Sequence, residues 1–474
     1  MNFPERNLLF IAYLFPPVGA GGLPGSQRAV KLIKYLKGYQ VTVLTVKEED
    51  YPDLVELNFL RDLPVKNETI VRTWFRNPFD YLLKLRSLLR GVVGGPVSAG
   101  SPPQHPPRAT DQPVAGKNPS MLQRFLDYVH ALCHFPDPAG AWIVPAVFVG
   151  RRLVKKRHID IVLATGNPWS SLVIAWLLHK LTGVPYIVDF RDPWVGNPFH
   201  TSRGRLLDTL ERYLERQVVI HALLVLVNTE ELRVEMVERY SEATAADKVL
   251  VVTNGFDPDD FGPPPALQPP HPEAAAEPLV LAHAGLLYGV RDPAPFLEAI
   301  SVLEGSGDVP AQAFRFVQMG KVSLQYDFHD RYRELISRGV VQDLGSYPFD
   351  ECLRQLQGAD VLLLIQPGTK SQVPSKLYDY LCLDLPIVTI TPLDGALGNL
   401  LRENGFGDVF SPDDVAGISA RLKQLWEEKA ANGSIRVHYQ HRDRFNIENI
   451  VSALEQNMNL ALMQQSETAS RCLP

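Results

Sequence analysis

The sequence predicts an α/β protein made of two successive domains, each built on a parallel sheet. Apolar runs typical of buried parallel strands alternate with stretches of helical periodicity in both halves of the chain. At 474 residues, the chain is too long for one ordinary hydrophobic core. A proline-rich segment, 259–278, separates the two halves and has the composition of a linker.

The composition favours a cytoplasmic globular protein. The sequence is 45% hydrophobic and 21% charged, and its net charge of −6 gives no reason to expect nucleic acid as a partner. Four scattered cysteines without a Cys-x-x-Cys motif suit a reducing compartment. No apolar run approaches the roughly 18 residues of a membrane span. The apolar run 8–15 lacks a basic flank and ends at Pro16-Pro17, so we interpret it as a strand and not as a signal peptide.

The first predicted βαβ unit has a glycine-rich turn. Strand 8–15 leads through this turn to a helix at 28–36 and a strand at 41–46. The turn is not a dinucleotide fingerprint, because Pro24 occupies the third glycine position, and this disfavours a dehydrogenase. Gly21 and Gly22 would still let the backbone approach a phosphate or sugar, with a plain surface loop as the even alternative.

Four segments between the first unit and residue 157 carry weaker signals. Residues 80–90 interleave leucines with basic residues at helical spacing, which suits an anionic membrane surface or, more often, packing on a core. Residues 91–119 have the composition of a mobile insertion. The cluster at 130–137 (His130, Cys133, His134, Asp137) matches no standard zinc spacing, so we interpret it as a helix end. The basic cluster 151–157 is a solvated face or helps to hold an anionic surface or acceptor.

Residues 160–257 show the clearest alternation in the first half. Strands are predicted at 161–165, 185–190, 222–227 and 248–253, with helices at 170–181 and 206–217. Arg191 and Asp192 directly follow a strand, and ligands of open α/β sheets bind at the carboxyl ends of strands. A carboxylate beside a guanidinium could bind sugar hydroxyls, or the carboxylate could act as a base with the guanidinium as its charge partner. An internal Arg–Asp pair that locks the loop is the alternative.

The second half repeats the alternation and contains a candidate anion site. Strands are predicted at 279–284, 315–319, 341–345, 361–365 and 386–390, and helices at 295–303 and 350–357. A further helix follows Pro374-Ser375-Lys376. Its free N–H groups together with the Lys376 charge suit a phosphate. The alternative is an ordinary helix start with Ser375 as its cap.

The order of these motifs resembles glycosyltransferases of the GT-B fold, and within them the retaining family 4. The resemblance covers about residues 6 to 460 except 91–119. It implies an acceptor-side domain at 1–258, the linker at 259–278, a nucleotide-sugar-binding domain at 279–435 and a helical tail at 436–474. The segments that carry it are the glycine-rich turn, 189–194 (Asp-Phe-Arg-Asp-Pro-Trp), 254–257 (Asn-Gly-Phe-Asp), 285–288 (Gly-Leu-Leu-Tyr) and 374–380 (Pro-Ser-Lys-Leu-Tyr-Asp-Tyr).

The resemblance also implies how a donor would be held. Arg291 and Lys376 resemble the basic pair that neutralises the diphosphate, with Pro374, Ser375 and the following amides completing the cradle. Tyr347, with Gly345, would lie near the base.

Two glutamates of the family signature align with Gln372 and Asp379. Asp379 would hold the ribose on a shorter arm, and Gln372 would bond a sugar hydroxyl without a charge. A histidine common in the family's first domain has no counterpart, because the matching region reads Ala-Thr-Gly-Asn at 164–167.

The function implied is transfer of a sugar from a nucleotide sugar to a polysaccharide or lipid-linked acceptor, with retention and without a metal or other cofactor. Asp192, Arg191 and Gln372 are the implied catalytic-site residues, with Asp192 orienting the acceptor or sugar. The implied setting is cytoplasmic polysaccharide biosynthesis, with possible peripheral contact to the inner face of the membrane. Two alternatives remain open. The first is a GT-B module that binds a sugar nucleotide or a partner protein without turnover, which the glutamine at position 372 in place of the family's glutamate leaves open. The second is a nucleotide-sugar epimerase, which would need acid/base carboxylates and histidines near the sugar.

Overall fold

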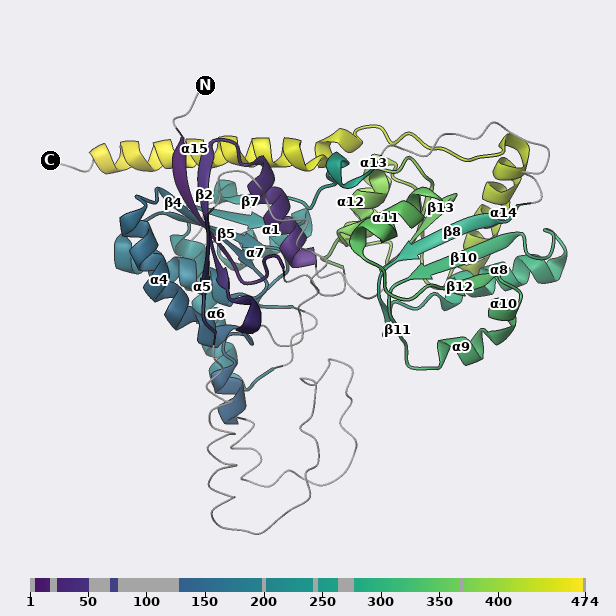
Figure 1. The fold of residues 1–474 in the computed structure, drawn as a ribbon, viewed down its shortest axis with the longest axis horizontal. Helices are drawn as coiled ribbons and strands as arrows, with labels where there is room; N and C mark the ends of the chain where they lie inside the picture. The colour runs from purple at the N-terminus through teal and green to yellow at the C-terminus, as the bar shows by residue number, and fades with distance from the viewer. Residues whose placement is uncertain are drawn as a thin grey trace, which may run out of the picture.

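A computed structural model describes residues 5–17, 24–50, 69–75, 128–197, 202–241, 246–262, 277–366, 368 and 370–471. The predicted glycine pair Gly21–Gly22, the basic stretch 80–90 and the insertion 91–119 lie outside these residues. Figure 1 shows the two halves of the chain side by side, each organised on its own sheet. The predicted α/β class with two parallel sheets is confirmed.

The first half forms a seven-stranded parallel sheet in the order β3-β2-β1-β4-β5-β6-β7. The chain reverses direction across the sheet between β1 and β4, which is the topological switch point where such folds bind ligands. The strands are β1 (Arg6–Ala12), β2 (Tyr39–Val46), β3 (Thr69–Thr73), β4 (Ile161–Gly166), β5 (Tyr186–Phe190), β6 (Leu224–Val227) and β7 (Val249–Val251). The helices are α1 (Pro24–Tyr35), α4 (Ile143–Lys156), α5 (Ser170–Thr182), α6 (Arg205–His221) and α7 (Glu230–Arg239).

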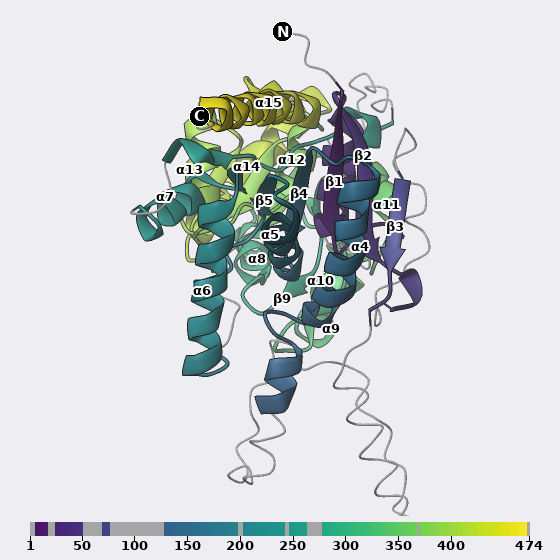
Figure 2. The same ribbon diagram turned by 90° about the vertical axis from the view of Figure 1, so that its left-hand side faces the viewer.

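Alternating side chains of this sheet feed two separate cores. Leu9 and Ile11 of β1 point to one face, which α4, α5 and α6 cover, while Leu8 and Phe10 point to the other. All four are fully buried, as expected for strands covered on both faces. Figure 2 shows α4, α5 and α6 on one side of the sheet and α15 (Ile447–Arg471) passing across its end.

The second half forms a six-stranded parallel sheet in the order β12-β10-β8-β13-β14-β15, so it repeats the same winding. Its faces are covered by α8 and α14 on one side and by α11, α12 and α13 on the other. The strands are β8 (Leu279–Ala284), β10 (Phe314–Met319), β12 (Val341–Asp343), β13 (Val361–Ile365), β14 (Ile387–Ile390) and β15 (Asp408–Phe410), with a separate pair, β9 (Leu287–Tyr288) and β11 (Val322–Ser323). The helices are α8 (Ala294–Ser306), α9 (Phe328–Arg331), α10 (Arg333–Ser337), α11 (Phe349–Gln357), α12 (Lys376–Leu381), α13 (Ala396–Asn404) and α14 (Val415–Asn432).

The last helix, α15, returns to the first half of the chain. Val451, Leu454 and Met458 are buried in the same core as Leu32 of α1. The amide of Gly38 donates to Glu455 Oε1 at 3.1 Å, which fixes the helix beside the end of α1. The predicted helical tail is therefore part of the packing of the N-terminal sheet.

Most predicted elements are present, with shifted ends. The strand predicted at 8–15 is Arg6–Ala12, and that predicted at 248–253 is only Val249–Val251. Both predictions extended the strand into residues that form loops at the carboxyl edge of the sheet. Within the described residues, no helix combines the length and apolar character needed to cross a membrane.

Candidate active site

The donor-site residues predicted in the second half of the chain gather at the carboxyl ends of β8 and β13, the switch point of the C-terminal sheet. Residues after β8 lead to Arg291, and residues after β13 lead through Gln372 to Lys376 at the start of α12. A cavity of about 290 Å³ lies there. Tyr347, Ser375, Lys376 and Asp379 all line it, whereas Arg291 and Pro374 are not among its lining residues.

The cavity has walls from both halves of the chain. Gln27 of α1 contributes from the N-terminal half. From the C-terminal half come an apolar wall that includes Phe349 and Leu353, and the backbone of Gly285 and Gly320. An apolar wall beside polar groups is the usual character of a small-molecule site.

Lys376 and Arg291 are two half-buried cations that act on each other. Burial and the Arg291 charge lower the pKa of Lys376 from 10.5 to about 7. Burial likewise lowers the pKa of Arg291, whose guanidinium carbon lies 5.2 Å from the centre of the Tyr288 ring. In the part of the chain that the structure describes, neither cation forms a salt bridge. An anion bound between them would offset both the burial and the repulsion.

Two glycines make room for the Lys376 ammonium. Gly285 has φ +149°, and a Cβ there would come to 1.5 Å from Lys376 Nζ. Gly320 has φ +135°, and its Cβ would come to 2.4 Å from the Gly285 carbonyl oxygen. Both positions therefore require glycine, because a side chain would displace the lysine or the neighbouring backbone.

The helix start contributes less than the sequence suggests. α12 has only six residues, Lys376–Leu381, so its dipole is weak, and most of the positive charge comes from the two cations. Ser375 is in helical conformation with φ −57°, and its side chain makes no capping hydrogen bond. The alternative of Ser375 as an ordinary side-chain cap is thus wrong.

Asp379 is held by a residue that sequence analysis missed. Lys31 of α1 lies 3.7 Å from Asp379 and 2.8 Å from Asp260, so it links the two halves of the chain. Burial raises the pKa of Asp379 to about 6, against the opposing effect of Lys31. A lysine two turns into a helix gives no sign in the sequence that it reaches another domain.

Gln372 also contacts the other half of the chain. Its amide donates to Asp192 Oδ1 at 2.9 Å. Nearby, the Thr229 hydroxyl donates to the Ser371 carbonyl at 3.0 Å. Two of the three predicted catalytic-site residues therefore meet directly across the two halves. Burial raises the pKa of Asp192, and the amide hydrogen bond acts in the opposite direction.

Arg191, the third predicted catalytic-site residue, holds a loop. Its Nε donates to the Gly166 carbonyl at 2.7 Å, and Nη2 donates to the carbonyl of Asn167. Burial lowers its pKa. Its donors hold the loop after β4 through backbone carbonyls. Among the described residues Arg191 forms no ion pair with Asp192, so the loop is not locked by the Arg–Asp pair that the sequence left as the alternative.

A buried arginine was also missed by the sequence analysis. Arg28 of α1 pairs with Asp189 through two hydrogen bonds of 2.7 and 3.0 Å and also donates to the carbonyls of Val252 and Thr253. Asp189 in turn accepts from the Thr165 hydroxyl at 2.8 Å. This network ties α1 to the carboxyl edge of the N-terminal sheet behind Asp192.

Nothing described in the structure forms a metal site. No group of three or more His, Cys, Asp or Glu side chains suited to a metal occurs among the described residues. His130 and His134 stack at 4.0 Å, and Asp137 accepts from the amide and hydroxyl of Ser170 at 2.7 Å each. Asp137 thus holds the start of α5, in keeping with the structural interpretation of this cluster.

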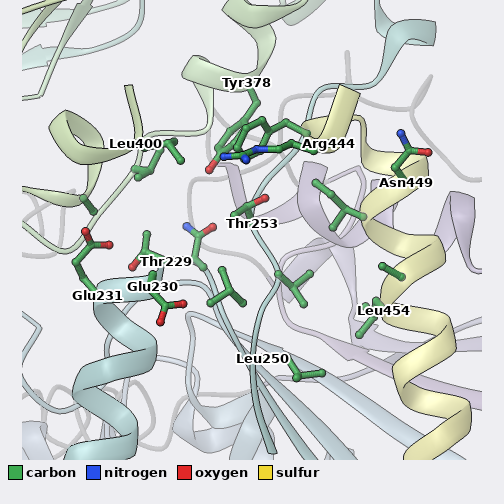
Figure 3. Close-up of a pocket in the computed structure, with 18 of the residues that line it drawn as sticks. Thr229, Glu230, Glu231, Leu250, Thr253, Tyr378, Leu400, Arg444, Asn449 and Leu454 are labelled. Atoms are coloured by element: carbon green, nitrogen blue, oxygen red, sulfur yellow. The ribbon is translucent and has the colours of Figure 1, made fainter. Parts of the chain in front are cut away.

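A larger cavity of about 720 Å³ lies on another side of α12. Figure 3 shows it between α7, α15 and α12, with Tyr378 and Arg444 at one end and Leu250 at the other. None of the predicted site residues lines it. Tyr378 lines this cavity, while Lys376 and Asp379 of the same helix line the smaller one.

Comparison with known proteins agrees with the geometry of the fold. Residues 36–255 match the family model described as a glycosyl transferase 4-like domain. A comparison with curated proteins gave no significant match.

Solved structures match over nearly the whole chain at low identity. A glycosyltransferase from Rickettsia africae aligns with a TM-score of 0.58 at 12% identity, covering 97% of this chain and 99% of that one. An α,α-trehalose-phosphate synthase (UDP-forming) from Burkholderia xenovorans in complex with glucose-6-phosphate gives 0.57 at 13%, covering 97% and 100%. An E. coli structure described as trehalose-6-phosphate bound with UDP-2-fluoro glucose gives 0.55 at 14%, covering 96% and 99%.

These structural matches establish the fold, and the family model adds the class of domain. The two parallel sheets, the switch-point cavity and the matching solved structures show that the chain has the GT-B fold, and residues 36–255 match the glycosyl transferase 4-like domain.

Proposed function

We propose that the protein binds a nucleotide sugar in the 290 Å³ cavity and transfers the sugar, with retention, to a polysaccharide or lipid-linked acceptor. The observation that supports this most is the pair of half-buried cations, Lys376 and Arg291, which form no salt bridge with any described residue. Burying charges without a partner is costly. A diphosphate is the ligand that would compensate both.

The lining residues suggest how the donor lies. The diphosphate would rest by Lys376 over the Gly285 backbone, with the base towards Tyr347 and the ribose at Asp379. The sugar would then extend towards Gln372 and Asp192, where the two halves of the chain meet. A structural neighbour bound with UDP-2-fluoro glucose supports a nucleotide sugar as the class of donor.

The proposed chemistry asks little of any single side chain. As the nucleoside diphosphate leaves the anomeric carbon, negative charge builds on the phosphate, and the two cations stabilise it. The acceptor hydroxyl would attack from the face that the diphosphate leaves and would pass its proton to the departing phosphate oxygen, so no protein nucleophile is required. Asp192 would orient the acceptor hydroxyl, with Gln372 holding the carboxylate in place. Because the two cations neutralise the leaving group, we also propose that no metal is required.

The test is a thermal-shift titration with UDP, GDP, ADP and their sugars. A ligand present at a hundred times its dissociation constant adds about 2.7 kcal/mol of stability. We expect a shift with one nucleotide. Lys376→Ala and Arg291→Ala should each weaken it about ten- to a hundredfold, because each removes a charge-assisted contact. The control is Lys423→Ala, which removes a partly exposed lysine of α14 that pairs with Asp308, away from the cavity.

Absence of any shift with the wild-type protein would overturn the donor site. Equal loss in the Lys423→Ala control would show that the effect is not local to the cavity. Once a donor is found, the configuration of the transferred sugar, read from the anomeric coupling in proton NMR of the product, decides between retention and inversion.

A further inference from the structure

The outward face of α4 carries an uncommon combination of side chains. Val144 and Phe148 are 74% and 59% exposed, and they continue along the same face into four exposed basic residues. The spacing of three and four residues places all six on one side of the helix. The basic residues are Arg151, Arg152, Lys155 and Lys156. We call this set the α4 stripe.

The charges of the α4 stripe are not neutralised by any residue that the structure describes. None of the four basic side chains forms an ion pair or hydrogen bond with a described residue. The Arg152 guanidinium lies 3.9 Å from the centre of the Phe148 ring, so a cation rests on an exposed aromatic face. Elsewhere on the surface, exposed basic residues such as Arg333 and Lys370 are paired with carboxylates.

The apolar end of the stripe lies at the carboxyl end of the N-terminal sheet, the end that carries Asp192. Asp137, just before α4, holds the amide of Ser170, which begins α5 directly after the carboxyl end of β4. Arg203 donates to the carbonyls of His134 and Pro136 at 3.1 and 2.8 Å, which brings the start of α6 to the same place. Two further apolar side chains are exposed there: Leu132 at 54% and Leu206 at 67%.

We propose that the α4 stripe is the surface by which this protein binds a bilayer with anionic headgroups. Apolar side chains would enter the headgroup boundary while the four basic side chains contact lipid phosphates. A nucleic acid would use the cations but not the exposed Val144 and Phe148. The inference rests on the proposed function, because it would place the site end of the sheet near a lipid-linked acceptor whose tail stays in the membrane.

The experiment is co-sedimentation of the full-length protein with vesicles, without donor or acceptor. The vesicles are POPC alone, or POPC with one quarter POPG. We expect binding to the anionic vesicles only, weakening as salt is added. Since each basic residue near an anionic surface contributes roughly a fivefold factor, replacing all four by alanine should lower partitioning several hundredfold. Phe148→Asp should also weaken it.

Matched controls separate the location of the charge from its amount. Arg333→Ala, Arg354→Ala, Lys370→Ala and Lys423→Ala together remove four solvent-accessible basic charges from the C-terminal half. Val302→Asp on α8 matches Phe148→Asp, because Val302 is 52% exposed. All controls should bind as the wild type does, and all variants should keep its melting temperature because the changed side chains are exposed.

Three results would overturn the proposal. These are a wild-type protein that stays in solution with both vesicles, α4 variants that bind like the wild type, and control variants that lose as much binding. Vesicle binding without any nucleotide shift would leave the α4 stripe in place and remove the donor site. A nucleotide shift without vesicle binding would do the reverse.

Discussion

The contact between Gln372 and Asp192 can be tested by giving the glutamine a charge. In Gln372→Glu, a second carboxylate would stand 2.9 Å from Asp192 Oδ1, where the amide now donates. The hydrogen bond would be lost and replaced by repulsion. The prediction concerns stability, so it does not depend on knowing the donor.

The size of the effect follows from two limits. Two like charges 2.9 Å apart repel by about 6 kcal/mol at an effective dielectric constant of 20 and by about 1.5 kcal/mol in bulk water. The pair is half-buried, so the value lies between these limits. Protonating one carboxyl group with an ordinary pKa near 4.3 costs only about 4 kcal/mol at pH 7, which caps the penalty. We therefore expect Gln372→Glu to lose about 2–4 kcal/mol at pH 7.

The sign of the pH dependence follows from proton uptake by the two carboxylates of the Gln372→Glu variant. The variant pair binds a proton more readily in the folded protein than in the unfolded chain, so the pKa of the pair is raised on folding. Its penalty is therefore largest at neutral pH and shrinks as the pH falls towards 4.5. The assay is denaturant unfolding between pH 4.5 and 7.5 for wild type, Gln372→Glu, Asp192→Asn and the double variant.

The double variant is the matched control. In Asp192→Asn with Gln372→Glu, the asparagine amide can donate to the new carboxylate, which restores one donor and one acceptor. It should recover most of the stability lost by Gln372→Glu alone. If Gln372→Glu is as stable as the wild type at pH 7, or if the double variant is no better than the single, the two halves are not held together by this pair.

Four further predictions concern the cavity. Wild-type affinity for the preferred nucleotide sugar should fall up to a hundredfold between pH 7 and 9, because the Lys376 pKa of about 7 leaves it uncharged at high pH, whereas Lys376→Arg should show a flat profile by calorimetry. Gly285→Ala should lose as much affinity as Lys376→Ala. Its control is Gly289→Ala, because Gly289 has φ +51° and a Cβ there would have no atom within 4 Å, so this variant tests backbone strain alone and should lose less affinity. Lys31→Ala should raise the pKa of Asp379 above its present value of about 6. Binding of the nucleotide sugar should then weaken more steeply than in the wild type as the pH falls from 7 to 5.5. A pH profile like that of the wild type would contradict the pairing of Lys31 with Asp379. EDTA should change turnover less than twofold, and activity restored by added Mn²⁺ would refute the proposal of metal independence.

Local pattern in the sequence was enough for the fold and for part of the site. A buried parallel strand is apolar along its whole length, so runs such as Val361–Ile365 were recognisable without any structure. The proposed cradle around Ser375 and Lys376 was recognisable for a similar reason, and the family resemblance added Asp379. Ser375, Lys376 and Asp379 are neighbours along a single loop and helix, and the structure shows all three lining the same cavity.

Contacts between distant segments were decided only by the tertiary structure. Asp192 and Gln372 are 180 residues apart, and their meeting depends on how one sheet sits against the other. The same is true of Lys31 with Asp379 and of Arg28 with Asp189. Periodicity indicates which face of a helix or strand is buried, but it does not indicate which other element packs against that face. For that reason the sequence pointed to residues that line the 290 Å³ cavity, and the packing of the two sheets determined which charges lie opposite them.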